Sequence, residues 1–323
     1  MNILILGGAG FVGNNLVRRC LREKKHNLTV VDSLDARLKS DIEFLNEERG
    51  EIEFIQADMR DSRSMDKIVE GKDVIFNCAA QSSHPMSFVD PAYDIAINCT
   101  GNITLLEAVR RHNKRALVIY ASSSTVIGKA LTRVVNEKHQ ELPLDIYSAN
   151  KGVAEKYYYI YNRVYDLKTL VLRFANLYGP YGKASPEFGF INYFIHRAFS
   201  GKEISIYGKG SQIRNVMYVE DACDLLYQAI FHKEIFGGIY FAVHREHYSV
   251  RKIAEEIVSA FGKGKVVTVA WPEIRKRIEI DDVIISGAKL YNKLQWKPRF
   301  TLRQGLLKTK EIMEEYKSKR GDI

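Results

Sequence analysis

The chain has few cysteines, and none of them lies near another. Cys20, Cys78, Cys99 and Cys223 are scattered over 323 residues. Disulfide frameworks and zinc sites use cysteines at short, paired spacings. We therefore expect no disulfide, no metal site, and a reducing, cytoplasmic location.

Long apolar runs are also missing. A membrane-spanning helix needs about 20 mostly apolar residues in a row, and no run in this sequence reaches that length. Residues 1–6 are mainly apolar but have no basic n-region and no cleavage site, so they predict a buried strand and not a signal peptide. We expect no membrane association.

Basic charge is dispersed, although the net charge is +9. One enrichment, at residues 308–320, has helical spacing and contains Glu311, Glu314 and Glu315. This pattern predicts a solvated terminal helix and not a nucleic-acid surface, so we expect no nucleic-acid partner. The positive net charge favours anionic ligands, such as a dinucleotide and a second nucleotide.

Short apolar runs alternate with amphipathic segments in the first half of the chain. The pattern predicts strands at residues 3–6, 28–31, 53–55, 74–76, 117–120 and 169–173. It predicts helices at residues 14–22, 64–69, 93–111 and 147–165. This alternation indicates an α/β fold: a doubly wound parallel (Rossmann) sheet with helices on both faces. After residue 182 glycines interrupt a series of short elements, and no linker-like segment separates them from the first half. This pattern predicts a smaller C-terminal α/β lobe that packs on the N-terminal domain.

A glycine-rich turn follows the first predicted strand. Gly7, Gly10 and Gly13 would provide the tight turn, a close approach of backbone to a pyrophosphate, and helix–strand packing. Asp32 ends the second strand, where a carboxylate accepts hydrogen bonds from the adenosine ribose and repels a 2′-phosphate. We therefore predict NAD in preference to NADP, a preference that the nearby Arg37 would weaken.

Tyr147 and Lys151 lie four residues apart, so on a helix they share one face. A nearby ammonium and a cationic nicotinamide both favour a phenolate, which makes Tyr147 a candidate base for hydride transfer at an alcohol carbon. Ser122, Ser123 and Ser124 come shortly before. The structural alternatives are that Tyr147 only packs in the core, that Lys151 faces solvent, and that the three serines form a polar loop.

At this point the sequence resembles the extended short-chain dehydrogenase/reductase family, the NAD-dependent nucleotide-sugar epimerases and dehydratases, over essentially its whole length. The motifs that carry the resemblance are Gly7-x-x-Gly10-x-x-Gly13, Asp32, Asp58, Asn77-Cys78-Ala79-Ala80, Asn98-x-x-Gly101, Ser122-Ser123-Ser124, Tyr147-x-x-x-Lys151, the run from Arg173 to Pro180 and the run from Ile206 to Arg214. Two departures are Val126-Ile127-Gly128, where the family has Val-Tyr-Gly, and Asn215, where it has Asp.

The resemblance implies roles for individual residues. Tyr147 would be the base, Lys151 would lower its pKa and hold the nicotinamide ribose, and Ser123 would bind the reacting oxygen. The implied cofactor-binding residues are Gly7, Gly10, Phe11, Val12, Gly13, Asp32, Asp58, Met59, Ala79, Ala80, Gln81, Asn98 and Lys151, with Asn98 a structural polar residue near the site. The implied substrate-binding residues are Ser82, His84, Ser123, Asn176, Asn192, Arg214 and Arg277. For His84, contact with a hexose and capping of the turn before Pro85 are equally open.

The two residues after Ser123 limit which reactions of the family this chain could catalyse. Dehydratases of the family typically carry an Asp-Glu pair there, and decarboxylases keep a Glu, but this chain has Ser124 and Thr125. We therefore predict an epimerase, a UDP-hexose 4-epimerase of the UDP-glucose/UDP-galactose type. A CDP-sugar 2-epimerase, another nucleotide-sugar epimerase and an NADPH-dependent 4-keto-sugar reductase are the alternatives. A non-catalytic dinucleotide-binding protein is disfavoured, because Tyr147 and Lys151 are both present.

The resemblance also implies a homodimer formed by a four-helix bundle, through the helices at residues 93–111 and 147–165. Tyr157, Tyr158, Tyr159 and Tyr161 would supply contact area to that bundle or belong to the core. We place the NAD-binding domain at residues 1–176, with a later segment near 212–235 returning to it. Residues 177–323 would form the nucleotide-sugar-binding lobe.

Overall fold

The computed structural model describes the whole chain except residues 274–275, 277–278, 281 and 321–323. Its centre is a seven-stranded sheet in the order β11-β7-β5-β4-β1-β2-β3, and every neighbouring pair is parallel. The strands are β1 (Asn2–Leu6), β2 (Asn27–Asp32), β3 (Ile52–Gln56), β4 (Val74–Asn77), β5 (Leu117–Ser123), β7 (Lys168–Phe174) and β11 (Ile239–Ala242). The predicted doubly wound sheet is confirmed.

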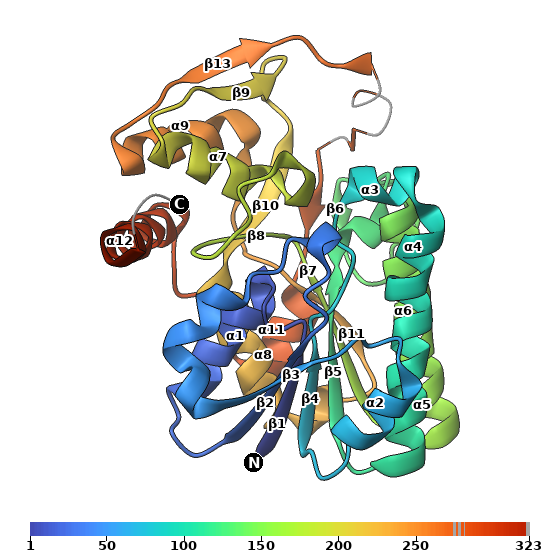
Figure 1. Cartoon of the computed structure of the whole chain (residues 1–323). Helices are drawn as coiled ribbons and strands as arrows, with labels where there is room; N and C mark the ends of the chain where they lie inside the picture. Colours follow the sequence, from blue (N-terminus) through green and yellow to red (C-terminus); the bar gives the residue numbers. More distant parts are fainter. Residues whose placement is uncertain (274–275, 277–278, 281, 321–323) are drawn as a thin grey trace.

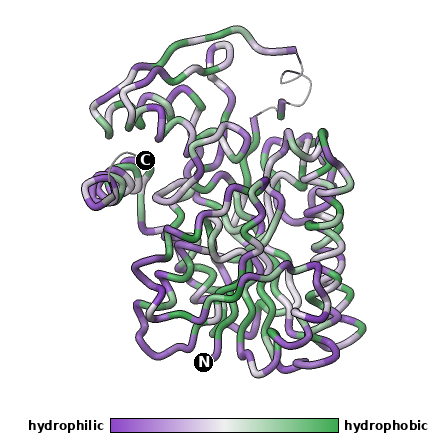
Figure 2. Tube along the Cα trace, viewed as in Figure 1, coloured by the Kyte–Doolittle hydropathy of each residue, from purple (hydrophilic) through white to green (hydrophobic). Residues whose placement is uncertain are grey.

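Helices cover both faces of the sheet (Figure 1). One layer holds α2 (Ser62–Ile68), α4 (Pro91–Ile95), α5 (Gly101–His112) and α6 (Ile146–Tyr165), and the other holds α1 (Phe11–Leu21), α8 (Val219–Ala229) and α11 (Ala288–Leu294). Alternate strand residues face opposite layers: Ile3 and Ile5 belong to the core beneath α1 and α8, while Leu4 and Leu6 belong to the core beneath α2 and α5. Figure 2 shows the resulting hydrophobic strands inside a more polar exterior.

The segment predicted as one helix at residues 93–111 contains a π-helical turn. This turn, at Ala96–Thr100, lies between α4 and α5. Such turns often occur at functional sites, and they change which side chains face inward. Here Asn98 and Asn102 are both fully buried.

The smaller lobe lies above the carboxyl ends of the sheet strands (Figure 1). It contains α7 (Phe190–Phe199), α9 (Val250–Phe261), α12 (Leu302–Arg320) and the parallel pair β9 (Ile204–Tyr207) and β13 (Val266–Val269). The strands β8 (Asn176–Tyr178), β10 (Ile213–Tyr218) and β12 (His247–Ser249) form a small sheet that joins the two parts. The two-residue strands β6 (Val134–Val135) and β14 (Ile284–Ile285) pair with each other in parallel, and the six-residue helix α3 (His84–Val89) precedes α4.

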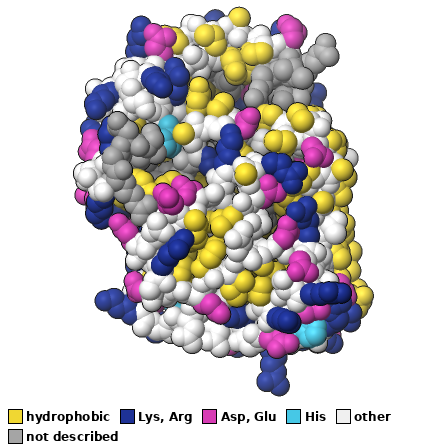
Figure 3. All heavy atoms as spheres, viewed as in Figure 1, with side chains coloured by type: hydrophobic (Ala, Val, Ile, Leu, Met, Phe, Trp, Pro, Cys, Tyr) yellow, Lys and Arg dark blue, Asp and Glu magenta, His cyan; other side chains and the backbone are white. Residues whose placement is uncertain are grey.

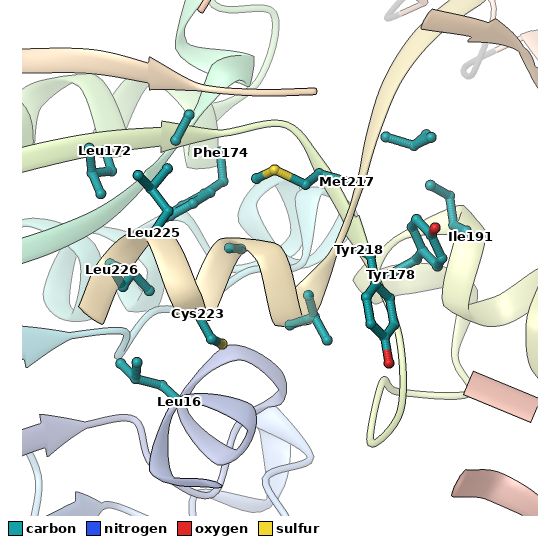
Figure 4. Packing of buried hydrophobic residues seen from close by; sticks show 14 of the residues in the cluster. Leu16, Leu172, Phe174, Tyr178, Ile191, Met217, Tyr218, Cys223, Leu225 and Leu226 are labelled. Carbon is teal, nitrogen blue, oxygen red and sulfur yellow. The ribbon is translucent and has the colours of Figure 1, made fainter. Parts of the chain in front are cut away.

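Late segments of the chain lie in the layers of the large sheet. Figure 4 shows Leu225 of α8 packing toward Leu172 and Phe174 of β7, and Cys223 toward Leu16 of α1. The strand β11 pairs with β7, and α11 packs on β11. The sheet unit therefore includes residues beyond 176, and the domain boundaries stay a prediction.

Candidate active site

A cavity of about 340 Å³ lies at the carboxyl ends of the parallel strands, where ligands of such sheets bind. Its walls come from both the sheet unit and the smaller lobe. The sequence-predicted residues that line it are Gly7, Gly10, Phe11, Val12, Gly13, Asp32, Asp58, Met59, Ala79, Ala80, Ser82, His84, Ser123, Tyr147, Lys151, Asn176, Asn192 and Arg214. Folding thus brings together residues that are spread over most of the chain.

The glycine turn has no room for side chains. Gly7 has φ +75°, and a Cβ there would lie 2.6 Å from the backbone nitrogen of Ala79. A Cβ on Gly13 would lie 2.1 Å from the carbonyl oxygen of Gly7. The following helix α1 has Gly10 as its N-cap, with no capping side chain and no acidic residue in its first turn. Its first amide groups therefore suit an anionic group in the cavity.

Asp32 is fixed at the end of β2 and is almost completely buried. One carboxylate oxygen accepts a hydrogen bond from the Ala9 amide at 3.0 Å, and the other accepts one from the Leu34 amide at 2.9 Å. Burial raises the pKa of this carboxyl group, while these amides, the Ser40 side chain and the Lys183 ammonium oppose the increase. The carboxylate is thus held rigidly at the edge of the cavity.

Asp58 lies on the same side of the cavity and pairs with Arg60 at 2.6 Å. The hydrogen bond from Arg60 lowers the pKa of this carboxyl group. Arg37, in contrast, is not among the described residues that line the cavity. It pairs with Asp35 at 3.0 Å and stacks on the ring of Tyr93, so its guanidinium is already occupied.

Tyr147, Ser123 and Lys151 all line the cavity. The Ser123 hydroxyl lies 2.8 Å from the Thr125 hydroxyl, and its proximity to Tyr147 favours ionisation of the phenol. Lys151 is buried, and its ammonium donates to the carbonyl oxygen of Ala121 at 2.8 Å. The helix α6, whose first turn is capped by Asp145, presents Tyr147 and Lys151 on one face, as their spacing predicted.

The pKa of Tyr147 differs from the sequence-based expectation. Burial raises it, the hydrogen bond with Ser123 opposes that increase, and the carboxylates of Asp145 and Asp94 add to it. Burial also lowers the pKa of Lys151 to about 8. In the protein alone the phenol is therefore a weaker acid than free tyrosine, so deprotonation needs positive charge that a ligand brings.

His84 lies beside Tyr147, with their ring centroids 4.7 Å apart in an edge-on arrangement. Its Nδ1 is 2.8 Å from a carboxylate oxygen of Asp145. The residue that caps the turn before Pro85 is Ser83, whose hydroxyl accepts from the Met86 amide at 3.2 Å. His84 is therefore a cavity-facing side chain and not the cap.

The smaller lobe contributes the polar residues opposite the glycine turn. The Asn176 amide donates to the carbonyl oxygen of Asn215 at 2.8 Å, and Asn192 accepts from the Gly179 amide at 3.1 Å. Arg214 donates to the carbonyl oxygens of Ile213 and Ile280 and pairs with Glu279. The predicted Arg277 lies outside the described residues.

Comparison with known proteins identifies this arrangement. Residues 3–241 match the model of the NAD dependent epimerase/dehydratase family. The UDP-glucose 4-epimerase of Mycolicibacterium smegmatis is 30% identical over 316 residues, covering 97% of this chain and 98% of the relative. The CDP-paratose 2-epimerase of Salmonella typhi is 26% identical over 337 residues, covering 95% and 98%. The crystal structure of Thermotoga maritima UDP-glucose 4-epimerase with UDP-glucose superposes with a TM-score of 0.88 at 27% identity, covering 98% and 99%.

The chain belongs to the NAD dependent epimerase/dehydratase family. The predictions of the extended short-chain dehydrogenase/reductase family, of an enzyme and of NAD as its cofactor are confirmed. The site fits this cofactor, because the close-packed glycine turn leads into the first turn of α1, which has no capping side chain and opens on the cavity. Among the described residues, no helix has both the length and the apolar character needed to cross a membrane.

Two predicted cofactor-binding residues of this family member do not reach the cavity. Gln81 and Asn98 are both fully buried beneath it. Gln81 donates to one carboxylate oxygen of Asp94 at 2.6 Å, and Asn98 and Asn150 donate to the other at 3.0 and 2.8 Å. These side chains provide the hydrogen bonds that the buried Asp94 carboxylate needs, and this carboxylate connects α4 to α6. Gln81 and Asn98 therefore help to position the site and do not line it.

Sequence reasoning missed Lys183, which lines the cavity from the loop after β8. Its ammonium donates to the carbonyl oxygen of Leu38 and faces Asp32. Nearby, Lys39 pairs with Glu187 at 3.3 Å. We call these cross-contacts between residues 38–39 and 183–187 the clasp. In the sequence the clasp is indicated only by the position of Lys183 directly after Gly-Pro-Tyr-Gly, and that motif does not show what the lysine contacts.

Proposed function

We propose that the enzyme is a nucleotide-sugar 4-epimerase that acts on a UDP-hexose. The observation that carries this proposal is that Ser123, Tyr147 and Lys151 line one cavity in which Ser124 and Thr125 stand where dehydratases of the family carry carboxylates. Among the described residues, the carboxylates that line the cavity are Asp32, Asp35 and Asp58, and Asp35 and Asp58 interact with each other on the Asp32 side. Oxidation and reduction at one carbon need only Ser123 and Tyr147 together with the cofactor, whereas elimination of water needs an additional acid and base.

The chain's own residues would act on the hydroxyl at C4. Tyr147 accepts the hydroxyl proton, and Ser123 donates a hydrogen bond to the oxygen as it becomes a carbonyl. When bound, NAD would supply the group that accepts the hydride and returns it, and the Lys151 ammonium would hold its ribose and add positive charge beside the phenol. Asn176 and Arg214 would anchor the diphosphate while the sugar turns over between the two transfers.

Asp32 supports recycling of a retained NAD. Its carboxyl group accepts two backbone hydrogen bonds at the end of β2, where its negative charge would disfavour the 2′-phosphate of NADP. A 4-keto-sugar reductase would consume NADPH from solution. The relative that acts on a CDP-sugar keeps a 2-epimerase as the second candidate.

The decisive experiment is incubation of the purified protein with UDP-, CDP-, GDP- and dTDP-sugars, without added cofactor, followed by chromatography. Interconversion of the two C4 epimers of a UDP-hexose without NADH accumulation is the expected result. Oxidation of added NADPH by a 4-keto sugar, with no epimerisation, would replace the proposal with a reductase. Tyr147→Phe should lower kcat by about 10²–10⁴-fold. Tyr165→Phe, at the exposed end of the same helix, is the matched control.

We further propose a homodimer in which α5 and α6 meet their counterparts in a second copy. The exposed apolar side chains Val153, Ile160 and Val164 share one face of α6, and Figure 3 shows hydrophobic side chains along the edge where these helices lie. Contiguous apolar surface of this kind marks interaction sites. Of the tyrosine cluster, Tyr158 and Tyr161 are core residues and Tyr159 is about half exposed.

The four cysteine thiols are unpaired, and three of them are buried. Unpaired thiols are typical of proteins that work in a reducing compartment. They support a cytoplasmic location, where nucleotide sugars would be the substrates.

A further inference from the structure

A histidine–aspartate pair faces the reacting end of the cavity. His84 lines the cavity beside Tyr147, with 4.7 Å between the ring centroids. Its Nδ1 lies 2.8 Å from Asp145, whose side chain is only 12% exposed. The two residues come from different elements, α3 and the cap of α6. Their contact therefore depends on the tertiary fold.

The geometry fixes which nitrogen of His84 is available. Burial opposes ionisation of Asp145, but hydrogen bonds from His84 and Ser148 outweigh it and lower the pKa of the carboxyl group. An ionised carboxylate only accepts hydrogen bonds, so Nδ1 of His84 carries a proton. In neutral imidazole Nε2 then has the lone pair. Among the described residues, no hydrogen bond engages Nε2.

Both members of the pair are held in place independently of any ligand. Asp145 accepts hydrogen bonds from the Ser148 amide at 2.7 Å and the Ser148 hydroxyl at 3.1 Å. The backbone carbonyl oxygen of His84 accepts from the Ser87 hydroxyl at 2.8 Å. A base that is oriented by a buried carboxylate is the arrangement used for proton transfer in many enzymes.

We propose that His84, oriented by Asp145, is a second acid–base residue that exchanges a proton at a carbon next to the C4 ketone. The proposal rests on the proposed function for the origin of that ketone. A carbonyl group at C4 makes the C–H bonds at C3 and C5 acidic. Nε2 of His84 takes the proton, the C–H electron pair becomes the C=C bond of an enolate, and the carbonyl π pair moves to the C4 oxygen.

The other cavity residues complete this step. Ser123 and protonated Tyr147 donate hydrogen bonds to the enolate oxygen, which is the stabilisation that such an intermediate needs. Return of the proton from His84 to the same carbon restores the ketone, with no oxidant or reductant consumed. Ser124 and Thr125 replace the carboxylates that could remove a proton from carbon, but His84 provides another base for that step in this cavity.

The test is deuterium exchange from D₂O into the sugar, measured by NMR and mass spectrometry. One sample contains the protein with its bound cofactor and the UDP-hexose that it epimerises. A second contains a UDP-4-keto-6-deoxy sugar, which presents the ketone without any hydride transfer. We expect deuterium at C3 or C5, above the background without protein. His84→Gln should lower the ratio of exchange to epimerisation by about 100-fold, the usual effect of a general base.

Two further variants separate catalysis from structure. Asp145→Asn keeps an acceptor for the Ser148 amide and should lower the same ratio less than His84→Gln does. His139→Gln, at a partly exposed loop position outside the cavity lining, should leave the ratio unchanged. Exchange absent from both samples, or equal in His84→Gln and the unmodified protein, would overturn the proposal. Exchange into the ketone without epimerisation of any hexose would remove the proposed 4-epimerase and keep the role of His84.

Discussion

The ammonium group of Lys151 donates a hydrogen bond to the carbonyl oxygen of Ala121 at 2.8 Å, and it lies 4.2 Å from the centre of the Tyr120 ring. Neither contact offsets the loss of hydration, so burial lowers the pKa of Lys151 to about 8. Burial raises the pKa of Tyr147, the proposed base. The two proposed catalytic groups are thus both destabilised in their charged forms in the protein without ligand.

Lys151→Met should therefore abolish turnover and stabilise the protein without cofactor. Removing a buried ammonium whose pKa is lowered this far is expected to add on the order of 2 kcal/mol to the free energy of unfolding at pH 7. Between pH 8 and 10.5 the unfolded chain still binds the Lys151 proton while the folded chain has released it. The unmodified protein gains stability there as pH rises, so the difference between the two proteins should shrink.

Chemical denaturation at several pH values measures this difference. Lys156→Met, on the exposed side of the same helix, is the control, and it should change stability by less than about 1 kcal/mol. A Lys151→Met protein that is less stable than the original at pH 7, or a difference that grows with pH, would contradict the burial argument.

The sequence predicts the parts of this site that depend on local geometry. A turn that excludes side chains requires Gly7 and Gly13, and the spacing of Tyr147 and Lys151 places both on one helix face. The strand runs and their alternation likewise give the parallel sheet. These inferences succeed because each relates residues that are near one another in the chain.

The rest depends on contacts that only folding creates. Gln81 follows Ala79 and Ala80 in the loop after β4, yet it turns beneath the cavity because Asp94 needs a donor. The raised pKa of Tyr147 results from burial by distant segments. No local pattern encodes these effects, and the same is true of the pairing of His84 with Asp145.

Asp32 should determine the preference for NAD over NADP. Asp32→Asn removes the negative charge that opposes a 2′-phosphate but keeps an oxygen for the Ala9 or Leu34 amide. We expect the ratio of Kd for NADP to Kd for NAD to fall by about tenfold, equivalent to about 1.4 kcal/mol. Calorimetric titration of the protein stripped of cofactor measures both constants. Asp66→Asn removes the same charge from the surface, and an equal effect there would assign the preference to net charge alone.

The clasp should slow release of the cofactor. Lys183 and Leu38 both line the cavity and are hydrogen-bonded to each other, and Lys183 faces Asp32. Lys183→Met should therefore speed NAD dissociation by about tenfold, the effect of one charge-assisted hydrogen bond. Lys39→Met breaks only the exposed pair with Glu187, and exposed pairs contribute little. Dissociation rates come from trapping released NAD with a second dehydrogenase. Equal rates in Lys183→Met and the unmodified protein would show that the clasp does not retain the cofactor.

The apolar face of α6 should hold two copies of the chain together. Val164 is 63% exposed on this face, one turn from Ile160, and a charge buried there without a partner costs several kcal/mol. Val164→Arg should therefore shift the protein from dimer to monomer in light scattering after gel filtration. Phe231→Arg is the matched control, because Phe231 is 54% exposed at the end of α8, in the opposite layer of the sheet. A dimer that survives Val164→Arg but dissociates with Phe231→Arg would place the interface on α8. A monomeric unmodified protein would contradict the proposed homodimer.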